Sequence, residues 1–267
     1  MFKPLLLLAL CAPLITQAQN VAENVAGKPA EKPAEKSAEP PATHVAPIPR
    51  VEIIAARDAE WASYRRAYQA AALSATYTRS RPLIQAHMQI RPLKPDASLA
   101  GLKLQLAGDT TQADIDVDGI GRATIPMSKQ AYDEDAVLRL NRGKGLYYFS
   151  GRFSIREHAD GVYPVAQLRA ACEQLIGAQR ASGYRLRLLG KNCSGVKFSY
   201  PASDAAMTVE VRGADGAPRP VGVIDGHPFE DNSMGVYKVA LLRFADLPAD
   251  GSVVTRAAPL AIGTVYE

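Results

Sequence analysis

The stretch LYYFSGRFSIR, residues 146–156, has the clearest strand pattern in the chain. Apolar and polar side chains alternate along it, and one face carries Tyr147, Phe149, Phe153 and Ile155. Alternation with a period of two predicts a β-strand with one face buried. Other strand-like stretches lie on both sides of it, separated by Asp, Gly and Pro turns: 84–91, 102–106, 113–117, 122–125, 136–140, 207–211, 221–224, 236–244 and 260–266. Short strands joined by turns predict a mainly β fold with antiparallel, sandwich-like regions.

A helix is expected before these strands. Asp58 is a suitable N-cap, and Pro82 marks the end of the helical pattern. One stripe at helical spacing lies between them: Trp61, Tyr64, Tyr68, Ala71, Ala72 and Ala75. Aromatic residues at this spacing normally pack on a core, which favours packing on the sheet over the alternative of a binding face.

A second, central helix is expected between Pro164 and Gly183. Its apolar stripe consists of Val165, Leu168, Cys172, Leu175 and Ile176. Residues 184–188 and 196–200 alternate in the manner of strands, so a hairpin with Cys193 in its loop should follow the helix. The predicted class is therefore α+β, mainly β, with an N-terminal helix and one central helix.

The N-terminal residues have the order of a secretory signal peptide. Lys3 precedes an apolar run from Leu5 to Ile15, and Ala18 is the expected cleavage position. The run is shorter than the ~20 residues of a membrane-spanning helix, so the chain should not span a membrane after cleavage. Leu10 before Cys11 argues against a lipid anchor. The expected location is the periplasm or the exterior.

Composition divides the chain into four predicted parts. Residues 1–18 are the signal peptide, and residues 19–50 are an Ala-, Pro-, Lys- and Glu-rich linker that cannot bury enough apolar surface to fold. Residues 51–163 are expected to form a helix plus β domain. Residues 164–267 are expected to form the central helix, the hairpin and a second β region.

Two cysteines, Cys172 and Cys193, follow the predicted signal peptide. An even number of cysteines in an exported protein predicts a disulfide, here between the central helix and the hairpin. A redox or nucleophilic cysteine is the alternative, and the absence of a CxxC spacing argues against it.

Net charge gives little support for nucleic-acid binding. The chain has 31 Lys and Arg against 27 Asp and Glu, a formal net charge of +4. That excess is too small to indicate a nucleic-acid partner without a clustered basic face.

The sequence DxDxDG, formed by Asp114, Asp116, Asp118 and Gly119, matches the opening of a calcium-binding loop. The match then fails, because position twelve is Ile125 where such loops have a bidentate Glu. The alternative is a strand with its Asp side chains outward, followed by a turn at Asp118. Calcium at the three Asp residues is the only cofactor that the sequence suggests.

The stretch DVDGIGRATIP, residues 116–126, resembles the strand-turn-strand of transthyretin-like and carboxypeptidase-regulatory-like sandwiches, whose pattern is D-x-x-G-x-(F)-x-I. Ala123 takes the place often held by the aromatic residue. The overall layout, including NRGKG at 141–145, is similar to exported proteobacterial families of unknown function. This resemblance implies a secreted β-sandwich and no particular activity.

Two histidines lie near acidic residues. His158 follows Glu157 and precedes Asp160. His227 lies between Asp225 and the pair Glu230 and Asp231. Such groups supply metal ligands or acid–base pairs, so a periplasmic hydrolase or metal-dependent enzyme is the alternative function.

No GxSxG, P-loop, GxGxxG or HExxH motif accompanies these histidines. The favoured function is therefore a non-enzymatic periplasmic protein that binds or scaffolds an envelope protein or a cell-wall component.

Overall fold

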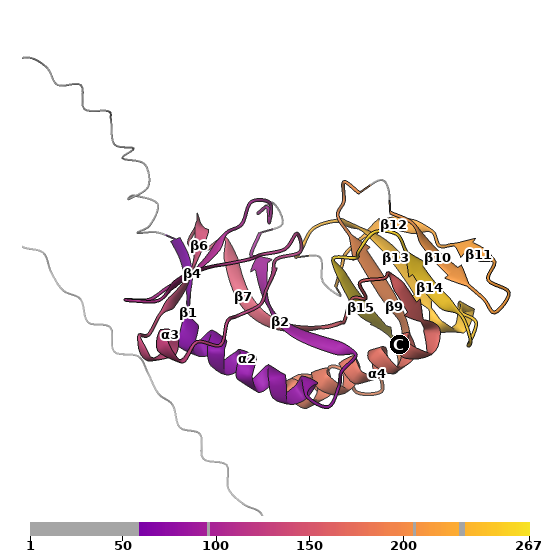
Figure 1. Ribbon diagram of the computed structural model, residues 1–267, viewed down its shortest axis with the longest axis horizontal. Helices are drawn as coiled ribbons and strands as arrows, with labels where there is room; N and C mark the ends of the chain where they lie inside the picture. Colours follow the sequence, from indigo (N-terminus) through magenta and orange to yellow (C-terminus); the bar gives the residue numbers. More distant parts are fainter. Residues whose placement is uncertain (1–58, 95–96, 205–206, 230–232) are drawn as a thin grey trace, which may run out of the picture. The chain divides into compact units, whose positions relative to one another are not determined.

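The computed structural model describes residues 59–94, 97–204, 207–229 and 233–267. The predicted signal peptide, the linker and Asp58 lie outside the described residues. The described chain is mainly β, with three antiparallel sheets and helices packed against them (Figure 1). The predicted class, with an N-terminal and a central helix, is confirmed.

The first sheet has four strands. In order across the sheet these are β1 (Ala59–Ser63), β6 (Val137–Gly143), β3 (Leu104–Ala107) and β4 (Gln112–Ile115). Leu104 pairs with Leu140 and Leu106 with Leu138, and all four side chains are buried in one apolar cluster. The alternation in β3 that predicted a strand therefore also supplies this core.

The second sheet has seven strands. In order these are β12 (Val223–Gly226), β13 (Tyr237–Arg243), β9 (Cys193–Tyr200), β15 (Ala261–Tyr266), β7 (Tyr147–Ile155), β2 (Ile84–Pro92) and β5 (Arg122–Ala123). Strands β15 and β7 are joined at Ile262 and Ile155. The sheet thus contains strands from both sides of the predicted boundary at residues 163 and 164, and the division into two domains stays a prediction.

The third sheet has the order β11 (Pro218–Pro220), β10 (Val209–Arg212), β14 (Ser252–Thr255) and β8 (Val162–Pro164). The sequence pattern identified only β10 among these strands. Strands β8 and β11 have three residues each, too few to show an alternation.

The N-terminal helix α2 (Tyr64–Thr78) begins later than predicted. Trp61 lies in β1, where it pairs with Arg139, so the prediction of a helix over this part is wrong. The N-cap is Ser63, whose hydroxyl accepts from the backbone N–H of Arg66. Tyr64 is fully buried, donates to the carbonyl of Pro126 (2.5 Å) and accepts from the N–H of Ser128 (2.8 Å), at the N-cap of α3 (Lys129–Asp133). These bonds fix the start of α2.

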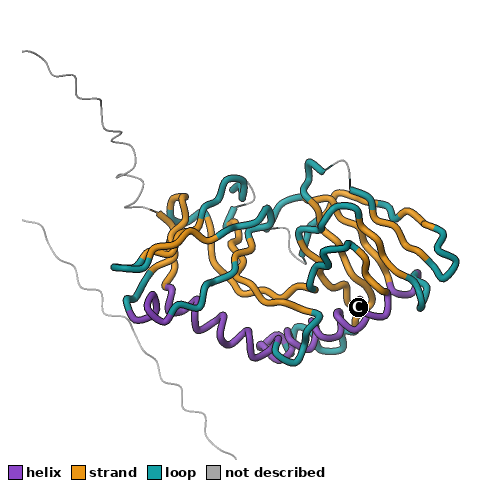
Figure 2. Tube along the Cα trace, in the orientation of Figure 1, coloured by secondary structure: helices purple, strands orange, loops and turns teal. Residues whose placement is uncertain are grey.

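The central helix α4 (Val165–Gln179) is confirmed, and it packs on β7 and β9. Figure 2 shows both long helices in purple along the orange strands. The predicted hairpin is only half present. Residues 196–200 belong to β9, but residues 180–184 continue the helix as a π-turn and no strand forms over 184–188. Gly183 has φ 108°, which only glycine adopts readily and which ends the helical segment.

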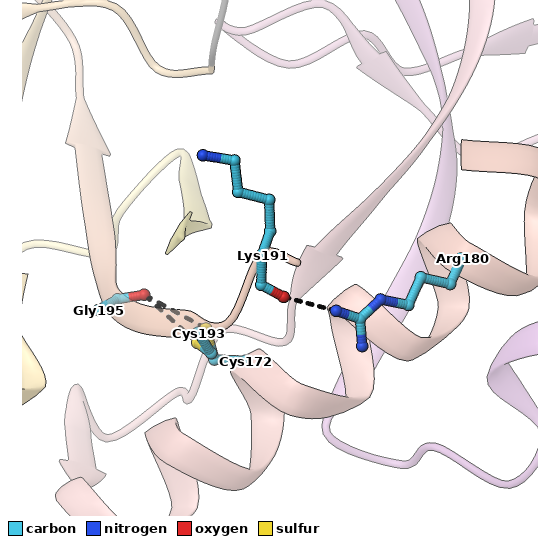
Figure 3. The surroundings of a disulfide bond; sticks show 5 residues. All are labelled: Cys172, Arg180, Lys191, Cys193 and Gly195. Carbon is cyan, nitrogen blue, oxygen red and sulfur yellow. Dashed lines mark hydrogen bonds between the residues drawn. A yellow bond between two sulfur atoms is a disulfide. The ribbon is translucent and has the colours of Figure 1, made fainter. Parts of the chain in front are cut away.

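The disulfide between Cys172 and Cys193 is present (Figure 3). The two Cα atoms are 6.1 Å apart, a normal separation for the bond. Cys172 lies in α4 and Cys193 is the first residue of β9, so the bond joins the helix to the sheet on which it packs. A disulfide of this kind indicates an oxidising, extracytoplasmic environment. No described helix is long and apolar enough to cross a bilayer.

Candidate functional site

A pocket of about 590 Å³ lies where the edges of two sheets come together. Strand β4 is the edge of the first sheet and β5 is the edge of the second. The wall from the first sheet is residues 113–118, and the opposite wall includes Gln85 and His87 of β2 and Arg122 of β5. Glu157, just after β7, completes the lining. This volume is in the range of small-molecule and peptide-side-chain sites.

Arg122 forms ion pairs with two carboxylates of the pocket lining, those of Asp118 and Glu157. Its Nε lies 2.6 Å from the carboxylate of Asp118, and its Nη1 lies 2.6 Å from that of Glu157. Burial alone lowers the pKa of Arg122, but the two carboxylates outweigh it and raise the pKa above its ordinary value. Gln85 also donates to Glu157 at 2.5 Å. Arg122 is therefore permanently charged and held in one position.

Asp118 shapes the turn between β4 and β5. One of its carboxylate oxygens accepts from the backbone N–H groups of Ile120 (3.1 Å) and Arg122 (2.8 Å). Gly121 has φ 78°, and a Cβ there would collide with the carbonyl oxygen of Ile90. The turn that the sequence offered as the alternative to calcium is thus present at Asp118.

His87 lines the pocket with a half-buried side chain. Its pKa is lowered to about 3, first by burial and then by the positive charges of Arg122 and Arg152, with the Gln89 side chain opposing the shift. Both ring nitrogens are shielded from solvent and have no hydrogen bond of normal geometry within the described residues. The imidazole is therefore neutral at physiological pH.

The three predicted calcium ligands have different surroundings, although all of them line the pocket. Asp118 is occupied by Arg122 and the turn, Asp114 accepts from Gln105 at 3.4 Å, and Asp116 is exposed. Within the described ranges, no three His, Cys, Asp or Glu side chains are grouped closely enough to hold a metal ion. Calcium binding stays a prediction.

His158 and His227 belong to separate parts of the chain. His158 stacks on Tyr163, its Nδ1 lies 2.8 Å from the carbonyl of Val162, and it lines a small hollow of about 10 Å³. His227 follows β12, and its Nδ1 lies 2.8 Å from the carbonyl of Gly235. Each Nδ1 is thus engaged by its own loop. Glu230 and Asp231, the predicted neighbours of His227, lie outside the described residues.

Sequence reasoning identified the acidic wall and missed the opposite one. Gln85, His87 and Gln89 alternate along β2 as a polar face, and Gln89 is fully buried and donates to the carbonyl of Ile120. Three polar residues at alternate positions of one strand were the available signal. Arg122 and Glu157 meet only because β5 pairs with β2 and β2 pairs with β7.

Comparison of the chain with protein-family models, with curated proteins and with solved structures finds no match. The resemblance to transthyretin-like segments stays an expectation.

Proposed function

We propose that this protein is an exported, non-enzymatic binding protein of the periplasm or exterior, and that its pocket takes a basic, extended peptide segment of an envelope protein. The observation that carries the proposal is the placement of an acidic pocket between two exposed strand edges.

The charge of the pocket favours a cation. Its lining contains four carboxylates, on Asp114, Asp116, Asp118 and Glu157, against the single guanidinium of Arg122. His87 adds no charge at neutral pH because its pKa is about 3. A ligand with Lys or Arg side chains gains attraction from the excess of negative charge, and an acidic ligand is repelled.

The strand edges favour an extended backbone. Strand β4 pairs only with β3 within the described part of the chain, so its outer edge is open toward the pocket. Strand β5 pairs with β2 only at Met88 and Gln89. The pocket-lining residues Gln85 to His87 therefore lie beyond the end of β5, where, within the described residues, this edge of β2 is open. Open edges pair with added strands, and alternate side chains of such a strand reach the pocket wall.

The test is fluorescence anisotropy with a labelled peptide of alternating Lys and Thr, compared with the same peptide carrying Glu in place of Lys. The Lys peptide should bind, and its affinity should fall as salt rises. The double variant Asp114→Asn/Asp116→Asn should bind it about tenfold more weakly, since two charges facing the ligand are removed. The matched control is Asp109→Asn, at an exposed position outside the pocket.

Equal binding of the two peptides, or an equal effect of Asp109→Asn, would contradict the proposal. Binding of the Lys peptide that is unaffected by the double variant would place the basic segment elsewhere on the protein.

A further inference from the structure

The segment Tyr184–Lys191, here called the 184–191 loop, is an exposed connection between the π-turn and β9. Three of its four large apolar side chains face solvent: Leu186 is 87% exposed, Leu189 is 77% exposed and Tyr184 is 50% exposed. The two leucines are the most exposed large apolar side chains in the described part of the chain. Neighbouring exposed leucines are costly in water and indicate a contact surface.

The charges of this region are all positive. Residues 174–203 contain five basic residues and no Asp or Glu. Arg185, Arg187 and Lys191 are exposed within or at the end of the loop, and their side chains make no ion pair with any described residue. The loop therefore combines protruding apolar groups with an uncompensated positive charge.

The base of the loop is rigid. The Cys172–Cys193 disulfide joins the chain before and after it. Arg180 donates to the carbonyl of Lys191 at 2.5 Å (Figure 3). It also donates to the carbonyl of Leu188 at 3.4 Å, and Leu188 is buried between its exposed neighbours. Asn192 exchanges two backbone hydrogen bonds with Glu267. A loop ordered before contact loses little conformational entropy on binding.

We propose that the 184–191 loop docks this protein on an anionic lipid surface. Leu186 and Leu189 enter the boundary between headgroups and acyl chains, Tyr184 lies at headgroup level, and the three cations contact lipid phosphates. The apolar groups protrude and do not line a recess, and the loop carries no carboxylate or amide side chain with which to specify a protein partner. A fluid anionic surface needs no such group. This proposal is independent of the pocket.

The test is co-sedimentation of the purified, disulfide-bonded protein with vesicles. Vesicles of phosphatidylglycerol and phosphatidylethanolamine should retain it, and vesicles of phosphatidylcholine alone should not. The variants Leu186→Ser/Leu189→Ser and Arg185→Gln/Arg187→Gln should each weaken binding at least about tenfold. The first removes the two leucines that insert, and the second removes two of the three cations that attract the lipid phosphates.

Matched controls separate the loop from general effects. Leu73→Ser changes an exposed leucine of α2, and Arg66→Gln/Lys144→Gln changes two exposed cations elsewhere. Both controls should bind as the wild type does. All variants alter exposed residues, so unchanged circular dichroism and melting temperature should accompany the loss of binding.

Three results would overturn the proposal. The first is equal retention by anionic and neutral vesicles. The second is loss of binding in the arginine variant alone, which would mean adsorption without insertion of the leucines. The third is absence of vesicle binding together with photo-crosslinking from position 189 to one envelope protein, which would assign the loop to a protein partner.

Discussion

Helix α4 and the pocket wall bury different kinds of side chain. Helix α4 buries seven residues, all apolar, and a disulfide ties it to β9. Along the pocket, β2 buries the imidazole nitrogens of the lining residue His87 and the nearby side chain of Gln89, and Arg122 forms two ion pairs. Apolar burial stabilises a fold, whereas buried polar groups without full hydrogen bonding destabilise it.

The difference teaches that one strand can serve both regions through alternate residues. Strand β2 adds Ile84 to the apolar cluster that contains the α4 residues and adds Gln85 and His87 to the pocket lining. Residues that reduce stability persist where a protein recognises something. Stability should therefore be lost by substitutions in the α4–β9 region and gained by an apolar substitution on the pocket wall.

The largest expected effect is in α4. Leu175→Ala should lower the free energy of unfolding by about 3 kcal/mol, because it removes a buried side chain and leaves a cavity. The measurement is urea unfolding with the disulfide intact. Leu73→Ala, at an exposed position of α2, is the control and should change the free energy by less than about 0.5 kcal/mol. If both variants lost a similar free energy of unfolding, burial in α4 would not be the source of stability.

The disulfide should contribute nearly as much. Cys172→Ser/Cys193→Ser should lower the free energy of unfolding by about 3 kcal/mol, because the unfolded chain regains the entropy of a loop with a sequence separation of 21. Reduction of the wild type should give the same value in denaturant titrations. A variant as stable as the oxidised wild type would show that the disulfide does not contribute to the free energy of unfolding.

Over a single pH unit, a smaller effect is expected from the titration of His87. The folded-state pKa of His87 is about 3 and an ordinary His has 6.5, so between these values the unfolded chain binds one proton more. Stability should fall as pH drops below 6.5, by up to about 1.4 kcal/mol per pH unit. Unfolding of wild type and His87→Leu at several pH values tests this. Equal slopes below pH 6.5 would mean that His87 is not buried in its neutral form.

The smallest expected effect has the opposite sign. At pH 7.5, His87→Leu should raise the free energy of unfolding by about 1 kcal/mol, since it replaces a buried polar ring lacking normal hydrogen bonds with an apolar side chain. His227→Leu, on an exposed loop, should not be stabilising. A destabilised His87→Leu protein would show that the imidazole is satisfied and would remove the contrast on the pocket side.

Sequence predicted the α4–β9 region better than the pocket. The central helix and the disulfide follow from local spacing around Cys172, and both are confirmed. Residues 184–188 alternate but form no strand, because Leu186 has no sheet to pack against and its side chain is exposed. Trp61 has helical spacing but pairs with Arg139, a partner that only the fold provides.

The pocket was predictable only as three Asp residues at alternate positions, 114, 116 and 118. Its other charged groups come from segments separated by long stretches of chain, such as Arg122 and Glu157. Their meeting depends on the order of strands in the sheets, which alternation within one strand does not contain.

The Cys172–Cys193 bond also determines how the protein tolerates a cut in the 184–191 loop. Arg185 is exposed there and offers a trypsin site. After cleavage at Arg185 the two fragments would stay covalently joined, and β15 would still pair with β7 and β9. A nicked molecule would therefore migrate as a single band on a non-reducing gel and separate only after reduction. The disulfide alone would thus hold the two fragments together after the loop is cut.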